Sequence, residues 1–229
     1  GSCAVAAAGA AAEMLLLGKK LSYIDILTPK GIKLHLDVAG AELCEDYAVC
    51  AIKKDSGDDP DITNGILVCA RVCFKPDGVD ITGGEGIGRV TKPGLDRPVG
   101  DYAINSVPRR MITDEVMRAA EKHSYHGGFS VKIFVPDGKE IGKKTYNPRM
   151  GIEGGISIIG TSGIVEPMSS SALVETIRAE AGMRYAQGYR NLCLTLGNYS
   201  EGFVEKNLPF SVENSVKCSN FIGEAIDIA

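Results

Sequence analysis

The stretch Gly83–Arg110, GGEGIGRVTKPGLDRPVGDYAINSVPRR, interrupts a series of short apolar segments that read as strands. It holds six glycines and five Arg or Lys residues, a composition too irregular for a regular helix or strand. Loops of this length are uncommon inside compact domains and are usually either functional or disordered. The interpretation of the whole chain depends on which of these two this stretch is.

The overall composition is that of a globular protein that is not dedicated to nucleic acid. Apolar residues make up 44% and charged residues 24% of the 229 residues, as in soluble domains. The net charge of −4 weighs against a protein built mainly to bind nucleic acid, since such domains usually carry a basic face. The length fits one large domain or two small ones.

The cysteines predict a reduced, cytoplasmic protein without a metal site of its own. Seven cysteines are scattered along the chain without a CxxC pair, and most lie in apolar runs. A free cysteine in such a run behaves as a small hydrophobic residue. Disulfides are rare in the cytosol, and zinc sites need closely spaced Cys or His pairs that this sequence lacks.

The Ala- and Leu-rich run Cys3–Leu17 predicts a buried helix that ends at Gly18. The run is too short to cross a bilayer, which needs about 20 residues, and it lacks the basic start of a signal peptide. We therefore expect no membrane association. The absence of an initial Met suggests that the natural start precedes Gly1.

Up to about residue 165 the pattern indicates an α+β domain. Alternating apolar and polar residues predict strands at 22–27, 32–38, 47–53, 66–74, 79–82 and 129–135. A helix is expected over Thr113–His123, with Thr113 as its N-cap. Asp137-Gly138 is typical of a hairpin turn, which would continue into Lys139–Lys144.

After the predicted hairpin the pattern changes and predicts a second, α/β domain, with the boundary near 155–168. Continuous apolar strands are predicted at 155–159, 192–196 and 216–219. They alternate with a helix at 169–187, a short helix that follows the turn 197–201 and ends at about Asn207, and a helix that begins at Asn220. That alternation is typical of a parallel sheet. Such a sheet needs helices on both faces, and few βα units are present, so we expect the domain to be truncated at its C-terminus. The domain boundaries are thus 1–165 and 166–229.

Gly84, Gly86 and Gly88 form the GxGxG core of the long stretch. A dinucleotide fingerprint needs a helix directly after the glycines, and Val90–Gly94 cannot begin one. One remaining interpretation is a surface loop whose glycines serve tight turns. The other is an anion site, because exposed glycine N–H groups and five cations outnumber the carboxylates of Glu85, Asp96 and Asp101.

Two other patterns have both a functional and an ordinary interpretation. Four aspartates fall between Asp55 and Asp61, and they form either a solvated turn or a carboxylate site for proton handling. The turns 160–163 and 197–201 each follow an apolar strand and precede a helix. Ligands of open α/β sheets bind at such strand ends, although ordinary helix-entry loops look the same.

The sequence resembles the cobalt-precorrin-5B C1-methyltransferase family (CbiD family) over nearly its whole length. The resemblance rests on Lys54–Thr63, Gly83–Leu95, Asn105–Arg109 and 147–161, and on the Gly1–Ala4 start. It implies a first domain like a permuted ribosomal S5 domain 2, followed by a small α/β domain. The family is longer at the C-terminus.

The resemblance implies transfer of a methyl group from S-adenosylmethionine to C1 of cobalt-precorrin-5B, giving cobalt-precorrin-6A in anaerobic cobalamin biosynthesis. Cobalt would arrive inside the anionic tetrapyrrole substrate, so no protein metal site is implied. The sequence is compatible with a homo-oligomer but does not decide the oligomeric state. Non-catalytic tetrapyrrole binding, as a scaffold protein of the pathway, and a small-molecule kinase are the alternatives.

Three sets of residues are assigned roles as hypotheses. Asp58 and Asp59 are the candidates for a catalytic polar role near the reacting ring. Substrate contacts are assigned to Gly84, Glu85, Gly86, Gly88, Arg89, Lys92, Arg109, Arg110, Asn147 and Arg149. The candidates for the methyl donor are Gly160, Thr161, Ser162, Gly163, Gly197, Asn198, Tyr199 and Glu201.

Overall fold

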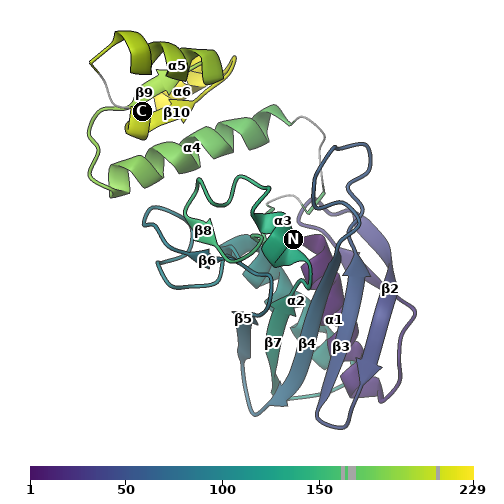
Figure 1. Cartoon of the computed structure of the whole chain (residues 1–229). Helices are drawn as coiled ribbons and strands as arrows, with labels where there is room; N and C mark the ends of the chain where they lie inside the picture. Colours follow the sequence, from purple (N-terminus) through teal and green to yellow (C-terminus); the bar gives the residue numbers. More distant parts are fainter. Residues whose placement is uncertain (161–162, 165–168, 210–211) are drawn as a thin grey trace. The chain divides into compact units, whose positions relative to one another are not determined.

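The computed structural model describes residues 1–160, 163–164, 169–209 and 212–229 and divides into two compact units (Figure 1). Unit 1 comprises Gly1–Thr91 and Gly100–Val165. Unit 2 comprises Lys92–Val99 and Glu166–Ala229. The chain is a mixed α+β protein.

Unit 1 is built on one six-stranded sheet in the order β1-β2-β3-β4-β7-β5, antiparallel except for the parallel pair β5–β7. Its longer elements are α1 (Ser2–Leu17), β1 (Tyr23–Leu27), β2 (Lys33–Leu43), β3 (Tyr47–Lys53), β4 (Leu67–Lys75), β5 (Val79–Gly83), α2 (Ser106–Lys122) and β7 (Gly128–Phe134). Its short elements are β6 (Arg89–Val90), α3 (Gly138–Gly142) and β8 (Ile152–Glu153). The strands predicted for this part are confirmed, with shifts of a few residues at their ends.

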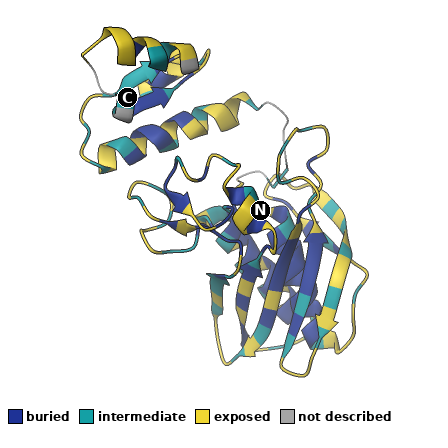
Figure 2. Cartoon of the chain, in the orientation of Figure 1, coloured by how far each residue is buried: buried dark blue, intermediate teal, exposed yellow. Residues whose placement is uncertain are grey.

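Helix α1 forms the centre of the core, as its composition predicts. Ala6, Ala7 and Ala8 are fully buried, and a helix that is apolar all round belongs in the interior. It packs on β3 and β4 and against α2 (Figures 1 and 2). A Cβ atom on Gly9 would lie 2.7 Å from Cγ of Glu115 on α2, so the two helices approach closely there. The chain leaves α1 at Gly18, in the left-handed conformation that was expected.

Helix α2 begins at Ser106 with Asn105 as N-cap, not at Thr113 as predicted. The prediction left residues 106–112 in the loop because Pro108 resembles a loop signal. In the first turn of a helix, however, the N–H groups have no intrahelical partner, so proline costs little there. Arg109 and Arg110 therefore belong to a helix and not to the long loop.

Two further predictions for unit 1 were wrong. Residues 138–142 form α3 and do not continue a hairpin. Residues 155–159 are not a strand of the second unit. Ile156 and Ile158 instead form isolated parallel bridges with Ile87 and Ile104, within unit 1.

Unit 2 contains a two-stranded parallel sheet, β9 (Cys193–Thr195) beside β10 (Ser215–Lys217), as the βα pattern predicts. Its helices are α4 (Ser170–Ala186), α5 (Asn198–Asn207) and α6 (Ile222–Ile228), and a 3-10 turn, η1 (Val212–Asn214), precedes β10. Ser169 caps α4 by accepting a hydrogen bond from the N–H of Ala172. Val216, Cys218 and Ala225 form a small core with Ile177 of α4.

All seven cysteines are free thiols, but they do not share one environment. Cys50, Cys69 and Cys218 are buried as expected, whereas Cys44 is exposed. Burial raises the pKa of Cys50 to about 12 and that of Cys69 to about 11. Across the described part of the chain, every helix is too short or too polar to traverse a bilayer.

Candidate functional site

The long stretch that opened the sequence analysis is ordered, and it pairs with a distant segment. The N–H of Gly88 donates to the carbonyl of Ile156 (2.8 Å), and the N–H of Ile156 donates to the carbonyl of Gly86 (2.9 Å). On the other side, the N–H of Ala103 donates to the carbonyl of Gly88 (2.8 Å). We call residues 84–90, 100–105, 138–142 and 147–158 the loop cluster.

The glycines of the loop cluster allow backbone segments to touch. Gly86 has φ 72°, and a Cβ atom there would lie 1.8 Å from the carbonyl oxygen of Val135. A Cβ atom on Gly155 would lie 2.2 Å from the carbonyl oxygen of Gly86. The N–H groups of Gly84 and Gly88 donate to backbone carbonyls. The expectation that these two glycines present N–H groups to a ligand was therefore wrong.

Arg89 is an exposed cation of the loop cluster. Its Nη1 donates to the carbonyl of Gly100 (2.6 Å), and its guanidinium lies 3.8 Å from the ring centroid of Tyr102. Stacking on an aromatic ring holds a guanidinium in place while its edge remains able to bind carboxylates. Glu85 is also exposed, and its carbonyl accepts from the N–H of Val135.

The other predicted substrate cations lie in different settings. The guanidinium of Arg109 donates to the carbonyls of Ile104 (2.9 Å) and Ile81 (2.8 Å), so it ties α2 to β5. Arg110 is exposed on α2, and Lys92 is half-buried in unit 2. Of this set, Arg89 and Arg110 are exposed cations within unit 1.

Asn147 holds in place residues 152–158 of the loop cluster, which we call the strip. Its side chain is buried, and its Nδ2 donates to the carbonyl of Gly155 (3.0 Å). Its Oδ1 accepts from the hydroxyl of Ser157 (3.1 Å). Arg149 lies nearby with its guanidinium 5.6 Å from the ring centroid of Tyr146. A cavity of about 250 Å³ adjoins this strip and is lined by Lys139, Gly142, Lys143, Pro148 and Ile152–Gly155.

The aspartate-rich turn is organised around residues that the sequence analysis did not select. Lys54 pairs with Asp61 (2.6 Å) and also hydrogen-bonds Ser56. Burial raises the pKa of Asp61, but hydrogen bonds from Lys54 and Thr63 outweigh burial and hold that pKa below its ordinary value. The Asp61-x-Thr63 spacing, typical of an Asx turn, was the available signal.

The two selected carboxylates of that turn lie outside this network. Asp58 is exposed, and Asp59 is half-buried. The N–H of Asp59 donates to the carbonyl of Ser56 (3.2 Å). Their catalytic role stays a prediction.

The two turns assigned to the methyl donor belong to different units. Residues 160–163 lie in unit 1, where the hydroxyl of Ser2 donates to the carbonyl of Gly163. Thr161 and Ser162 lie outside the described residues. Residues 197–201 lie in unit 2, after β9. The expectation that both turns follow strands of one parallel sheet was therefore wrong.

The turn after β9 retains the features of a ligand site. Gly197 precedes α5, whose first residue is Asn198, and the side chain of Tyr199 is 97% exposed. The hydroxyl of Thr195, at the carboxyl end of β9, is buried and has no hydrogen-bond partner within the described residues. A buried polar atom of that kind calls for an explanation, and a bound ligand is one.

Glu201 connects α5 to the neighbouring strand. Its Oε1 accepts from the hydroxyl of Ser215 (3.0 Å), and its Oε2 lies 3.0 Å from Nζ of Lys217. Its carboxylate is therefore engaged on β10.

Comparison with known proteins agrees with this arrangement of motifs. A family model described as CbiD matches residues 1–167. The chain belongs to the CbiD family. All four motif segments named in the sequence analysis lie within those matched residues, so this membership confirms the resemblance.

Curated CbiD relatives match the chain from end to end. A protein of Ruminiclostridium cellulolyticum named cobalt-precorrin-5B C(1)-methyltransferase is 49% identical, over 100% of this chain and 60% of its own length. A protein of the same name from Treponema denticola is 48% identical, over 100% of this chain and 63% of its own length. The chain thus spans somewhat less than two thirds of these CbiD relatives.

A solved CbiD structure has a related fold. The cobalamin biosynthesis protein CbiD of Archaeoglobus fulgidus, a 1.9 Å crystal structure, is 28% identical to this chain with a TM-score of 0.57. The match covers 99% of this chain and 71% of that one.

Proposed function

We propose that this chain acts in cobalamin biosynthesis, as all or part of an enzyme that methylates C1 of cobalt-precorrin-5B to give cobalt-precorrin-6A. The observation that carries the proposal is end-to-end similarity to proteins named for this activity, at 49% and 48% identity. The methyl donor in this proposal is S-adenosylmethionine, and the substrate is an anionic cobalt tetrapyrrole.

The proposed reaction needs no covalent nucleophile from the protein. A sulfonium-bound methyl group is already activated, so its transfer to a ring carbon is an in-line displacement. The protein's main contribution is to align the two reactants, and alignment can supply several kcal/mol of the barrier reduction. Cobalt is part of the substrate in this account.

We assign the loop cluster to the substrate side. Exposed Arg89, braced by Tyr102 and Gly100, suits the carboxylates of a tetrapyrrole. Arg110 is a second exposed cation on the same unit. Buried Asn147 acts through position, by fixing the strip at 155–157.

We assign the methyl donor to the turn after β9. The buried hydroxyl of Thr195 and the exposed Tyr199 support this choice, because a donor with polar and aromatic groups could engage both. Gly197 keeps the approach to the strand end open, since no heavy atom lies within 4 Å of a Cβ placed there.

We also propose that unit 1 corresponds to a permuted ribosomal S5 domain 2. The six-stranded sheet with α1 and α2 packed against it is compatible with that description.

A turnover assay tests the proposed function. The chain is incubated with cobalt-precorrin-5B and S-adenosylmethionine carrying a labelled methyl group, and label is measured in the tetrapyrrole. We expect label to accumulate with time. Tetrapyrrole binding without label transfer would favour the scaffold alternative. Tight ATP binding by calorimetry would favour a kinase, although α2 begins too far beyond the glycines to cradle a triphosphate.

A further inference from the structure

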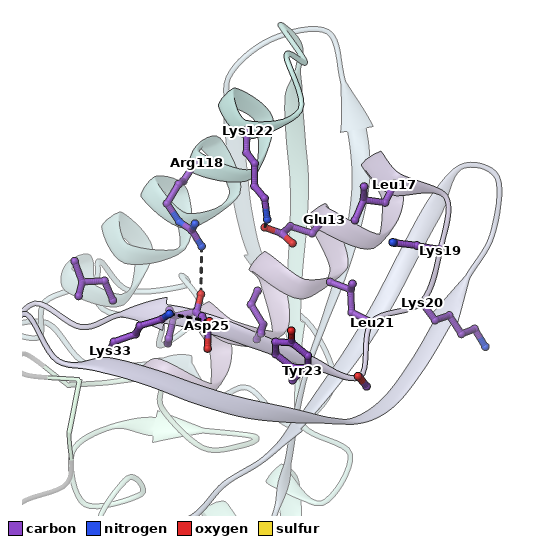
Figure 3. A pocket seen from close by; sticks show the side chains of 14 residues that line it. Glu13, Leu17, Lys19, Lys20, Leu21, Tyr23, Asp25, Lys33, Arg118 and Lys122 are labelled. Atoms are coloured by element: carbon purple, nitrogen blue, oxygen red, sulfur yellow. Dashed lines mark hydrogen bonds and ion pairs between the residues drawn. The ribbon is translucent and has the colours of Figure 1, made fainter.

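A cavity of unit 1 lies away from the loop cluster, where the end of α1, strand β1 and the second half of α2 meet. We call it the α1–β1 groove, and its volume is about 670 Å³ (Figure 3). It is lined by Glu13, Leu17, Lys19–Leu27, Lys33, Arg118 and Lys122. This volume is within the range of sites for small organic molecules.

Most of the charges in the groove are already paired within the protein. Lys122 pairs with Glu13 (2.9 Å), and Lys33 pairs with Asp25 (2.9 Å). Arg118 pairs with Glu115, which lies just outside the lining. Three cations are therefore balanced by three carboxylates.

Lys19 and Lys20 are left as the excess positive charge. Neither has an ion-pair partner within 4 Å among the described residues. Figure 3 shows the Lys19 side chain directed toward the groove, whereas Lys20 extends away from the other lining side chains. Lys19 is thus the cation positioned to meet a ligand.

Apart from Ser22, the uncharged side chains of the lining are aliphatic or aromatic. Leu17, Leu21 and the aromatic ring of Tyr23 lie near Lys19, and Tyr23 is 52% exposed. Exposed apolar side chains next to an uncompensated cation match a ligand with an apolar body and a negative group.

A peptide strand pairing with the free edge of β1 is the less favoured occupant. The carbonyl of Asp25, in the middle of β1, already accepts a hydrogen bond from Nη2 of Arg118 (3.3 Å). That contact occupies the edge where an added strand would bond.

We propose that the α1–β1 groove is a second ligand site, which binds a small organic anion carrying one or two carboxylates on an apolar body. Lys19 binds the carboxylate, and Leu17, Leu21 and Tyr23 contact the apolar part. The proposal does not depend on methyl transfer, because no residue of the loop cluster or of the turn after β9 takes part.

Fluorescence titration with dansyl-glutamate, an apolar ring system bearing two carboxylates, tests the proposal on the full chain. Dansyl amide serves as the matched probe without charge. We expect saturable binding of dansyl-glutamate, at least about fivefold tighter than dansyl amide, and weakened by salt. Equal affinity for the two probes would overturn the role of charge.

The variant Lys19→Gln tests whether the probe binds in the α1–β1 groove. Its matched control is Lys144→Gln, which makes the same charge change at an exposed lysine just after α3. Lys19→Gln should weaken dansyl-glutamate binding about fivefold, with urea unfolding unchanged, and Lys144→Gln should leave binding unaltered. Equal effects of Lys19→Gln and Lys144→Gln would overturn the assignment. So would loss of probe binding in Arg89→Gln with binding retained in Lys19→Gln. Displacement of the probe by an acidic strand-forming peptide would also overturn it.

Discussion

At the scale of single residues, contact distances separate the glycines that serve packing from those that serve turns. Gly86 and Gly78 share positive φ values of 72° and 66°. A Cβ atom on Gly86 would overlap the carbonyl of Val135, whereas one on Gly78 would meet no atom within 4 Å. The sequence does not reveal this difference, because both positions look like turn glycines.

Gly86→Ala should therefore destabilise the protein more than Gly78→Ala. The first variant adds a steric overlap to the backbone strain, for a loss of roughly 3 kcal/mol. The second should cost only about 1 kcal/mol, from the left-handed backbone. Urea unfolding monitored by circular dichroism measures both, and equal losses would contradict the close packing of the loop cluster.

Asp61 should contribute to stability in a pH-dependent way. Its folded-state pKa is lowered, so its contribution is present above its ordinary pKa and is lost as the pH falls through the lowered value. At neutral pH, Asp61→Asn should cost about 1 kcal/mol or less, because both partners are partly exposed. Below about pH 4 the gap between the two proteins should close.

Unfolding curves across that pH range check this prediction. Asp58→Asn is the control, since Asp58 is exposed in the same turn and should show no such gap. A difference between wild type and Asp61→Asn that is independent of pH would show that the Lys54–Asp61 pair does not act through charge.

At the scale of elements, the strands were predictable where alternation and burial agree. The predicted range Tyr47–Lys53 is the observed β3, since Ala48, Cys50 and Ile52 point into the core. The start of α2 was missed because Pro108 imitates a loop signal. Pairing of 84–90 with 152–158 could not be predicted, because it depends on backbone contacts between glycines distant in sequence.

Helix α5 offers a direct test of local helix energetics in unit 2. Gly202 lies inside this helix, and a Cβ atom there would meet nothing within 4 Å. Gly202→Ala should raise stability by about 0.5–1 kcal/mol, since alanine loses less backbone entropy than glycine in a helix. The measurement is the thermal midpoint followed by circular dichroism.

Gly188→Ala provides the matched control for that prediction. Gly188 has equally open surroundings but φ +95°, so the same substitution should lower stability there. If both variants shift the midpoint in the same direction, the assigned backbone conformations are inconsistent with unit 2 as described.

At the scale of the whole molecule, exposed basic side chains on an acidic chain support the assignment of the substrate side. The net charge is −4, yet exposed Arg89 and Arg110 belong to unit 1 beside or within the loop cluster. The sequence predicted which cations belong to this region. It did not predict which of them bond to the backbone and which remain exposed. Arg109 supports the backbone of β5, whereas Arg89 is held by Tyr102 and remains exposed.

The central claim is that two exposed cations of unit 1, Arg89 in the loop cluster and Arg110 on α2, bind the carboxylates of the corrin substrate. Equilibrium binding of cobalt-precorrin-5B and of S-adenosylmethionine to the Arg89→Ala/Arg110→Ala variant tests it most directly, with Lys144→Ala/Lys206→Ala as the charge-matched control. We predict that the first variant loses about tenfold or more in substrate affinity, keeps its donor affinity, and unfolds like wild type. Substrate affinity equal to that of the control variant would contradict the account.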